Sequence, residues 1–142
     1  MAKPVNLRNV KGIPVGRTHH KGTLFPLISE MGASGVKGGL KISCYEYEPG
    51  GCTDSEFHDD MEQAYMILDG KLNVTLNGEK HGLIPGSCLH IPLCAVHESI
   101  AVGDRPVRVL VISSPVGFPR GYWHTDITDQ IPTNRREDDL GD

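Results

Sequence analysis

The chain has 142 residues, of which 38% are hydrophobic and 23% charged, and its formal net charge at pH 7 is -4. This size and composition suit one folded domain with one hydrophobic core. The acidic balance and the lack of a basic stripe interleaved with aromatic residues argue against a nucleic-acid partner. No apolar run approaches the roughly 20 residues that span a bilayer, which argues against a membrane partner.

Residues 1–20 are interpreted as an N-terminal arm, and they lack the apolar centre of a secretory signal. The segment "LKISCYEYEPGG", from residue 40, alternates like a strand and is expected to stop at Pro-Gly-Gly. "QAYMILDGKLNVTLNGEK" predicts two strands joined at Asp69-Gly70, a strong hairpin signal, and Asn77-Gly78 is expected to close the second.

"GSCLHIP" and the β-branched "RPVRVLVISSP" predict the remaining strands, and no window shows the sustained 3.6-residue period of a long helix. Several short strands separated by turn residues are typical of a sandwich or barrel. We therefore predict an all-β fold with one domain over residues 21–125, followed by a polar C-terminal tail over 126–142.

Four cysteines occur without any CxxC pair: Cys44, Cys52, Cys88 and Cys94. In a domain of this size, that pattern favours reduced, buried thiols in a cytoplasmic protein rather than a disulfide framework.

The chemically richest stretch is "EFHDDMEQ", residues 56–63. In a strand, residues i and i+2 point to the same face, so Glu56 and His58 are expected to project together, and both side chains would reach one cation if that face lines a barrel. Gln63 opens the next strand run in phase with Tyr65. A further candidate, His97, follows the turn-like "PLCAV".

The spacing of these residues resembles that of the cupin family. Its first motif runs Gly, five residues, His-x-His, three or four residues, Glu, six residues and Gly. Read back from Gly70, this places Gln63 at the Glu position, Glu56 and His58 at the two His positions, and Gly50 at the opening Gly.

The second cupin motif, Gly-x5-Pro-x-Gly-x2-His, matches "GSCLHIPLCAVH", in which Gly86, Pro92 and His97 are in register and Cys94 stands where glycine is usual. The resemblance implies a single-domain cupin-like β-barrel, also called a double-stranded β-helix or jelly roll. It further implies that small members of this type form homodimers through an edge strand or an exchanged N-terminal arm.

The resemblance also implies one divalent metal ion (Fe, Mn, Ni, Co or Zn) held by an altered ligand set: Glu56, His58, Gln63 and His97. One carboxylate, two imidazoles and an amide oxygen form a mixed site suited to such metals, and the net ligand charge of about -1 matches the usual set. Glu62 is an alternative to Gln63, but the one-residue slip it needs would turn every neighbour to the other face.

For function, the resemblance implies an oxidoreductase or lyase that acts on a small oxygenated organic molecule as a dioxygenase, decarboxylase or lyase. Two alternatives remain: a non-catalytic binding or sensing cupin, and a metal-free isomerase or epimerase with Tyr65 and Glu56 as acid and base. His19-His20 is interpreted as a surface pair, although the arm could fold over the barrel mouth, and His90 could face either way.

Overall fold

The computed structural model describes residues 4–28 and 39–115, so the predicted tail and residues 116–125 of the predicted domain lie outside the described part. In chain order its elements are η1 (Leu7–Asn9), β1 (Ile13–Pro14), β2 (His19–Ile28), β3 (Lys41–Glu56), β4 (Met61–Asp69), β5 (Lys71–Leu76), β6 (Glu79–Leu83), β7 (Cys88–Ile91), β8 (His97–Val102) and β9 (Val107–Pro115). Among the described residues, no helix is long and apolar enough to cross a membrane.

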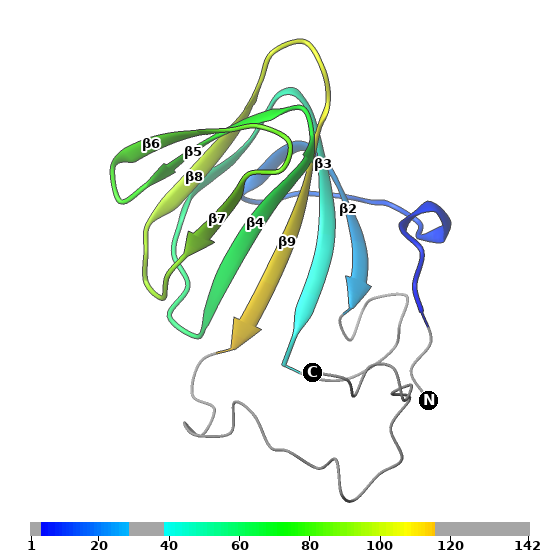
Figure 1. Ribbon diagram of the computed structural model, residues 1–142, viewed down its shortest axis with the longest axis horizontal. Helices are drawn as coiled ribbons and strands as arrows, with labels where there is room; N and C mark the ends of the chain where they lie inside the picture. The colour runs from blue at the N-terminus through cyan, green and yellow to red at the C-terminus, as the bar shows by residue number, and fades with distance from the viewer. Residues whose placement is uncertain (1–3, 29–38, 116–142) are drawn as a thin grey trace, which may run out of the picture.

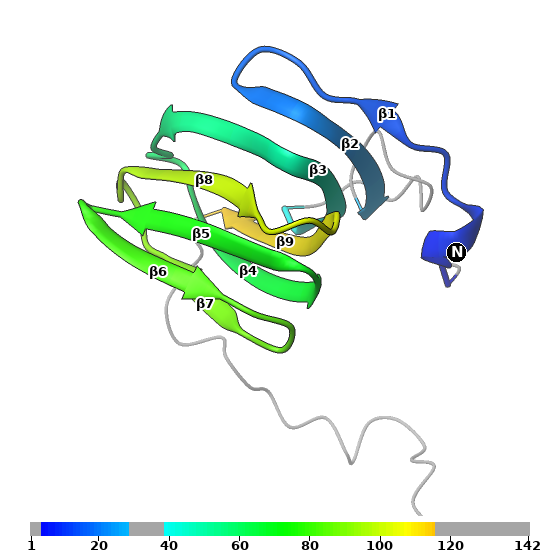
Figure 2. The same cartoon turned by 90° about the horizontal axis from the view of Figure 1, so that it is seen from above.

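The strands form one antiparallel sheet that curls into a nearly closed barrel (Figures 1 and 2). The order along the sheet is β6-β5-β8-β3-β9-β4-β7, with β2 on the other side of β3 and β1 paired to β2. The long strand β3 joins the two halves, because residues 41–47 pair with β9 whereas residues 52–56 pair with β8. The all-β barrel prediction is confirmed.

The predicted stop at Pro49-Gly50-Gly51 is wrong, because β3 continues through it to Glu56. Gly50 has φ +80°, a left-handed conformation that glycine adopts without a Cβ penalty. The strand therefore bends here instead of ending, and changes its partner from β9 to β8. The end of β3 thereby reaches the start of β8, where Glu56 pairs with His97.

The Asp69-Gly70 hairpin prediction is also wrong, because β4 pairs with β7 and β9 while β5 pairs with β6 and β8. A two-residue type I′ turn needs positive φ at both central residues. Only Gly70 has it here, at +77°, so the chain passes from one half of the barrel to the other. Asn77 and Gly78, at φ +48° and +83°, do form a tight turn between the paired strands β5 and β6.

The core fills the barrel with alternate residues from both halves: Tyr47, Tyr65, Ile67, Leu72, Val74, Leu83, Ile91, Ala95, Ala101, Val107, Val109 and Val111. The predicted phase of β4 is confirmed, since Gln63, Tyr65 and Ile67 all point inward.

All four cysteines are free thiols, but the prediction that they are buried holds only for Cys44. Cys88 is exposed because it lies on the outward face of β7, and Cys94 is exposed in the turn that precedes β8.

Candidate metal centre

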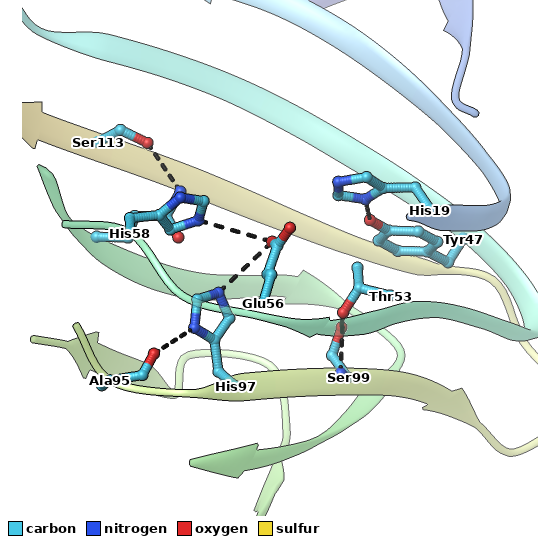
Figure 3. Close-up of polar contacts among 10 residues, drawn as sticks. His19, Tyr47, Thr53, Glu56, His58, Ala95, His97, Ser99 and Ser113 are labelled. Carbon is cyan, nitrogen blue, oxygen red and sulfur yellow. Dashed lines mark hydrogen bonds and ion pairs between the residues drawn. The ribbon is translucent and has the colours of Figure 1, made fainter. Parts of the chain in front are cut away.

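Three side chains converge where β3 ends and β8 begins (Figure 3). Glu56, the last residue of β3, pairs in register with His97, the first residue of β8. Its Oε1 lies 3.7 Å from Nε2 of His58 and 3.6 Å from Nε2 of His97, and all three ligand atoms lie within 4.8 Å of one another. Ligands at about 2.1 Å from one tetrahedral ion lie about 3.4 Å apart, so a small contraction would suffice to hold one ion.

His58 reaches this group by a route other than the predicted one. It lies beyond the end of β3, in the connection to β4, so the two-residue period of a strand does not place it beside Glu56. Its carbonyl instead accepts a 2.7 Å hydrogen bond from the backbone N–H of Cys94. Cys94 has φ +62°, the conformation for which glycine is usual at this motif position, and this turn fixes the backbone of His58.

Three polar atoms in this group and in the cavity beside it are buried without a hydrogen-bond partner in the described part of the chain: Nε2 of His58, Nε2 of His97 and Oε1 of Gln63. Each such atom typically costs about 1–3 kcal/mol. A cation that accepted these lone pairs would remove the cost, so the residues present fit a metal ion.

Neighbouring groups orient these orphaned atoms. Nδ1 of His97 lies 2.9 Å from the carbonyl of Ala95, which can only accept, so Nδ1 carries the proton and Nε2 offers its lone pair. Nε2 of Gln63 donates to Oγ of Ser113 at 3.0 Å, which leaves Oε1 of the amide free. Gln63 also lines the same cavity as Glu56 and His58.

Charge and burial act in opposite directions on the centre. Contact with the His97 imidazole lowers the pKa of the Glu56 carboxyl, and this outweighs desolvation, which raises it. Desolvation lowers the pKa of His97, whose side chain is 1% exposed, but Glu56 and the Ala95 carbonyl together raise it above its usual value. Glu56 is therefore ionised at neutral pH and available as a ligand.

A cavity of about 230 Å³ opens beside the centre. Its lining residues come from both halves of the barrel: His19, Lys41, Ser43, Tyr45, Tyr47, Thr53, Glu56, His58, Met61, Gln63, Tyr65, Leu72, Ser99, Val109, Val111 and Ser113. Tyr65 packs its ring edge-on against His97, with 6.2 Å between ring centroids. Burial raises the pKa of the Tyr65 phenol, which keeps it protonated as a donor.

His19 lies in the cavity, a position that the sequence left open as the alternative to a surface pair. The interpretation of His19-His20 as a surface pair is correct only for His20, which pairs with Asp54 at 3.0 Å on the exposed side. His19 lines the cavity, and its Nδ1 lies 2.7 Å from the hydroxyl of Tyr47. Recognising from the sequence that a strand begins at His19 would have indicated this position. The register between β2 and β3 shifts between His20 and Gly22, however, and this shift obscures the alternation of inward and outward residues.

Glu62 and His90 form a separate exposed pair, with Oε1 of Glu62 2.8 Å from Nε2 of His90. Glu62 therefore does not face the centre, and β4 keeps the register in which Gln63 points inward.

Comparison with known proteins agrees with this geometry. The family model described as Cupin domain matches residues 43–113, half of the chain. The uncharacterized protein MJ1618 of Methanocaldococcus jannaschii is 31% identical over 70 residues, and polyketide synthase CurC of Streptomyces cyaneus is 30% identical over 78 residues. These alignments cover 49% and 55% of this chain. They cover 54% and 51% of the two relatives, so the chain spans about half the length of the curated relatives it matches.

Among solved structures, the polyketide cyclase RemF from Streptomyces resistomycificus superposes with a TM-score of 0.68 at 22% identity. The match covers 93% of this chain and 95% of that one. At this identity, the similarity demonstrates a shared fold over nearly the whole chain.

Proposed function

The chain belongs to the cupin domain family, and we propose that it is a metal-dependent enzyme acting on a small oxygenated organic molecule. Glu56, His58, Gln63 and His97 would hold one divalent ion, Fe, Mn, Ni, Co or Zn. The observation that carries the proposal is the set of buried, unpartnered nitrogen and oxygen atoms beside an ionised carboxylate. A first-row metal suits this mixture of imidazole and oxygen ligands.

When bound, the ion would supply Lewis-acid polarisation of a carbonyl or carboxylate oxygen of the substrate. The chain's own residues would do the rest. Tyr65, protonated and inside the cavity, is placed to donate a hydrogen bond to a substrate oxygen. Glu56 is committed to the ion, so we assign it as a ligand in the loaded enzyme rather than as the base.

The cavity and the comparisons both support a proposal for the substrate class. Two proteins similar to this chain carry names that refer to polyketides, which are chains of repeated carbonyl groups. The cavity is lined by hydroxyl groups, the rings of Tyr45 and Tyr47, and apolar side chains such as Val109 and Val111. We therefore propose a substrate with at least two carbonyl oxygens and a carbon backbone, and a lyase-type or cyclisation reaction that needs proton transfer beside a polarised carbonyl.

The test is metal content by elemental analysis of purified full-length protein. Wild type is expected to carry close to one equivalent of a first-row metal after incubation with Fe, Mn, Ni, Co or Zn salts. His58→Ala and His97→Ala should lose it. His90→Ala is the matched control and should keep it, because His90 is exposed and pairs with Glu62. A wild type that stays empty with every ion would refute the metal-dependent function.

Chelation separates the alternatives that share this fold. A metal-free isomerase using Tyr65 and Glu56 would keep its activity in EDTA, whereas the proposed enzyme would lose it. A non-catalytic cupin would bind metal and ligand without turnover.

A further inference from the structure

We propose that His19 is the general acid–base residue of this cavity and that the hydroxyl of Tyr47 positions it. The proposal rests on the proposed function, because it assumes a carbonyl substrate at the metal centre. It identifies the group that moves a proton, a role that the four metal ligands cannot perform while their lone pairs are engaged.

Contacts on two sides fix the His19 ring. Its Nδ1 lies 2.7 Å from the Tyr47 hydroxyl, and its ring stacks on Tyr45 with 5.2 Å between centroids and 13° between planes. All three side chains line the cavity, and Tyr47 is only 3% exposed. In Figure 3, His19 and Tyr47 lie on one side of Glu56, with His58 and His97 on the other. His19 lines the same cavity as Glu56 and His58, so a substrate in this cavity could contact both the proposed ion and this histidine.

The Tyr47 hydroxyl suits a base that must gain and lose a proton. When Nδ1–H of His19 donates to the Tyr47 oxygen, Nε2 keeps its lone pair and can accept a proton. Burial raises the pKa of the Tyr47 phenol, so it remains a hydroxyl at neutral pH. Burial also lowers the pKa of His19, against the opposing pull of Glu56 and Asp54, which keeps the imidazole neutral and ready to accept.

The step is balanced within the substrate and His19. The C–H bond of a carbon next to a carbonyl breaks, its proton goes to Nε2 of His19, and its electron pair forms the enolate C=C bond while the carbonyl oxygen takes the negative charge. Nδ1–H continues to donate to Tyr47 in the imidazolium. Return of the proton from Nε2 to carbon restores the neutral ring, so no oxidant or reductant is needed.

The probe is ethyl acetoacetate, a β-ketoester, with deuterium uptake at its central carbon followed by ¹H NMR in D₂O against a protein-free blank. Zinc-loaded wild type is expected to accelerate exchange. His19→Gln should slow the protein-catalysed rate about 100-fold, the lower range of a lost general base. His20→Gln is the matched control: the neighbouring histidine pairs with Asp54 outside the cavity and should leave the rate unchanged. Tyr47→Phe should reduce the rate less than His19→Gln and shift its pH profile.

A second measurement needs no substrate. Long-range ¹H–¹⁵N NMR of the metal-free protein reports the His19 tautomer, and Tyr47→Phe should change the Nδ1 signal while His20→Gln should not. Metal content is measured on the same samples. His19→Gln that binds zinc and exchanges as fast as wild type overturns the proposal alone. Zinc-loaded wild type without exchange above the blank overturns it too, whereas wild type that takes up no metal refutes the proposed function as well.

Discussion

Replacing Gln63 by glutamate tests whether this residue belongs to the metal centre. The side chain is 9% exposed, its Nε2 donates to Ser113 and its Oε1 has no partner. Gln63→Glu puts a second carboxyl beside Glu56 in the cavity, and burial together with this like charge should raise its pKa in the folded, metal-free protein. A bound cation would reverse that penalty. The variant should therefore be less stable than wild type without metal and gain more stability from it.

The size of the effect has an upper bound, because a buried carboxyl can protonate instead of staying charged. With an unfolded-state pKa of about 4.3 and about 1.36 kcal/mol per pKa unit, protonation at pH 7 costs at most about 3.7 kcal/mol. We expect a loss of about 2–3.5 kcal/mol, roughly 7–12 °C in Tm for a domain of this size. Since the folded pKa lies above the unfolded one, the loss should vanish below about pH 4 and grow as pH rises.

Thermal unfolding in EDTA and in excess zinc, at pH 7 and pH 4.5, measures both quantities. Zinc at 100 times its Kd would stabilise wild type by about 2.7 kcal/mol, and Gln63→Glu should gain more. Glu62→Gln, one residue away, is the control: it removes an exposed pair with His90 worth at most about 1 kcal/mol and should not alter the zinc response. A Gln63→Glu protein as stable as wild type in EDTA at pH 7, with no larger zinc shift, would refute the assignment of Gln63.

Cys94→Gly should stabilise the protein by about 1 kcal/mol in urea unfolding, because Cys94 has φ +62°, which strains a residue with a Cβ. An unchanged urea midpoint would contradict this. Gly70→Ala should lower the free energy of unfolding by about 2 kcal/mol more than Gly78→Ala does. Both glycines have positive φ, but a Cβ at Gly70 would lie 2.5 Å from the carbonyl oxygen of Pro106, whereas a Cβ at Gly78 meets nothing. Equal losses in the two variants would contradict this. In EDTA, the free energy of unfolding should be highest between about pH 4.3 and 6.5. Folding lowers the pKa of Glu56, so the stability that this group contributes is lost as pH falls through that pKa. Folding raises the pKa of His97, so its contribution is lost as pH rises through that pKa. A flat profile over this range would contradict that coupling. We also expect a homodimer in sedimentation velocity, since β6 and β7 each have a strand on one side only in the described sheet; a monomer at all concentrations would exclude it.

The local patterns of the sequence predicted five of the nine described strands, β3, β4, β5, β7 and β9, and the inward face of β4, but not β1, β2, β6 or β8. Alternation in β4 placed Gln63 and Tyr65 inside correctly, and Asn77-Gly78 marked a true tight turn. These features depend on residues close in sequence, where period and turn chemistry apply directly. The Asp69-Gly70 turn failed because its dipeptide is equally compatible with a hairpin and with a crossing between the two halves of a barrel, and only long-range pairing decides between them.

In the candidate metal centre too, the sequence predicted what depends on local spacing and not what depends on long-range contacts. The spacing of the two motifs located Glu56 and His97, which the register of β3 and β8 makes direct neighbours. His58 was found for an incomplete reason, since the Cys94 N–H, 36 positions later, fixes its backbone. For His19 the sequence did not decide between a surface position and the barrel mouth, because its place depends on pairing with Thr53, 34 positions away, across an irregular register. Contacts of this range leave no periodic signal in the sequence.

The partners of the unpaired atoms connect stability with function. Ala95 fixes the His97 tautomer and Ser113 holds the Gln63 amide, so Nε2 of His97 and Oε1 of Gln63 keep free lone pairs before any ion binds. A fold that only needed stability would satisfy these atoms with hydrogen bonds, since each costs about 1–3 kcal/mol while unpaired. Retaining three such atoms, on His58, His97 and Gln63, at one cavity and the carboxylate of Glu56 that lines it is a local conflict of the kind expected at functional sites. The same arrangement explains why a cation should both stabilise the fold and complete the site: the free energy lost to these atoms in the metal-free protein becomes binding free energy when an ion satisfies them.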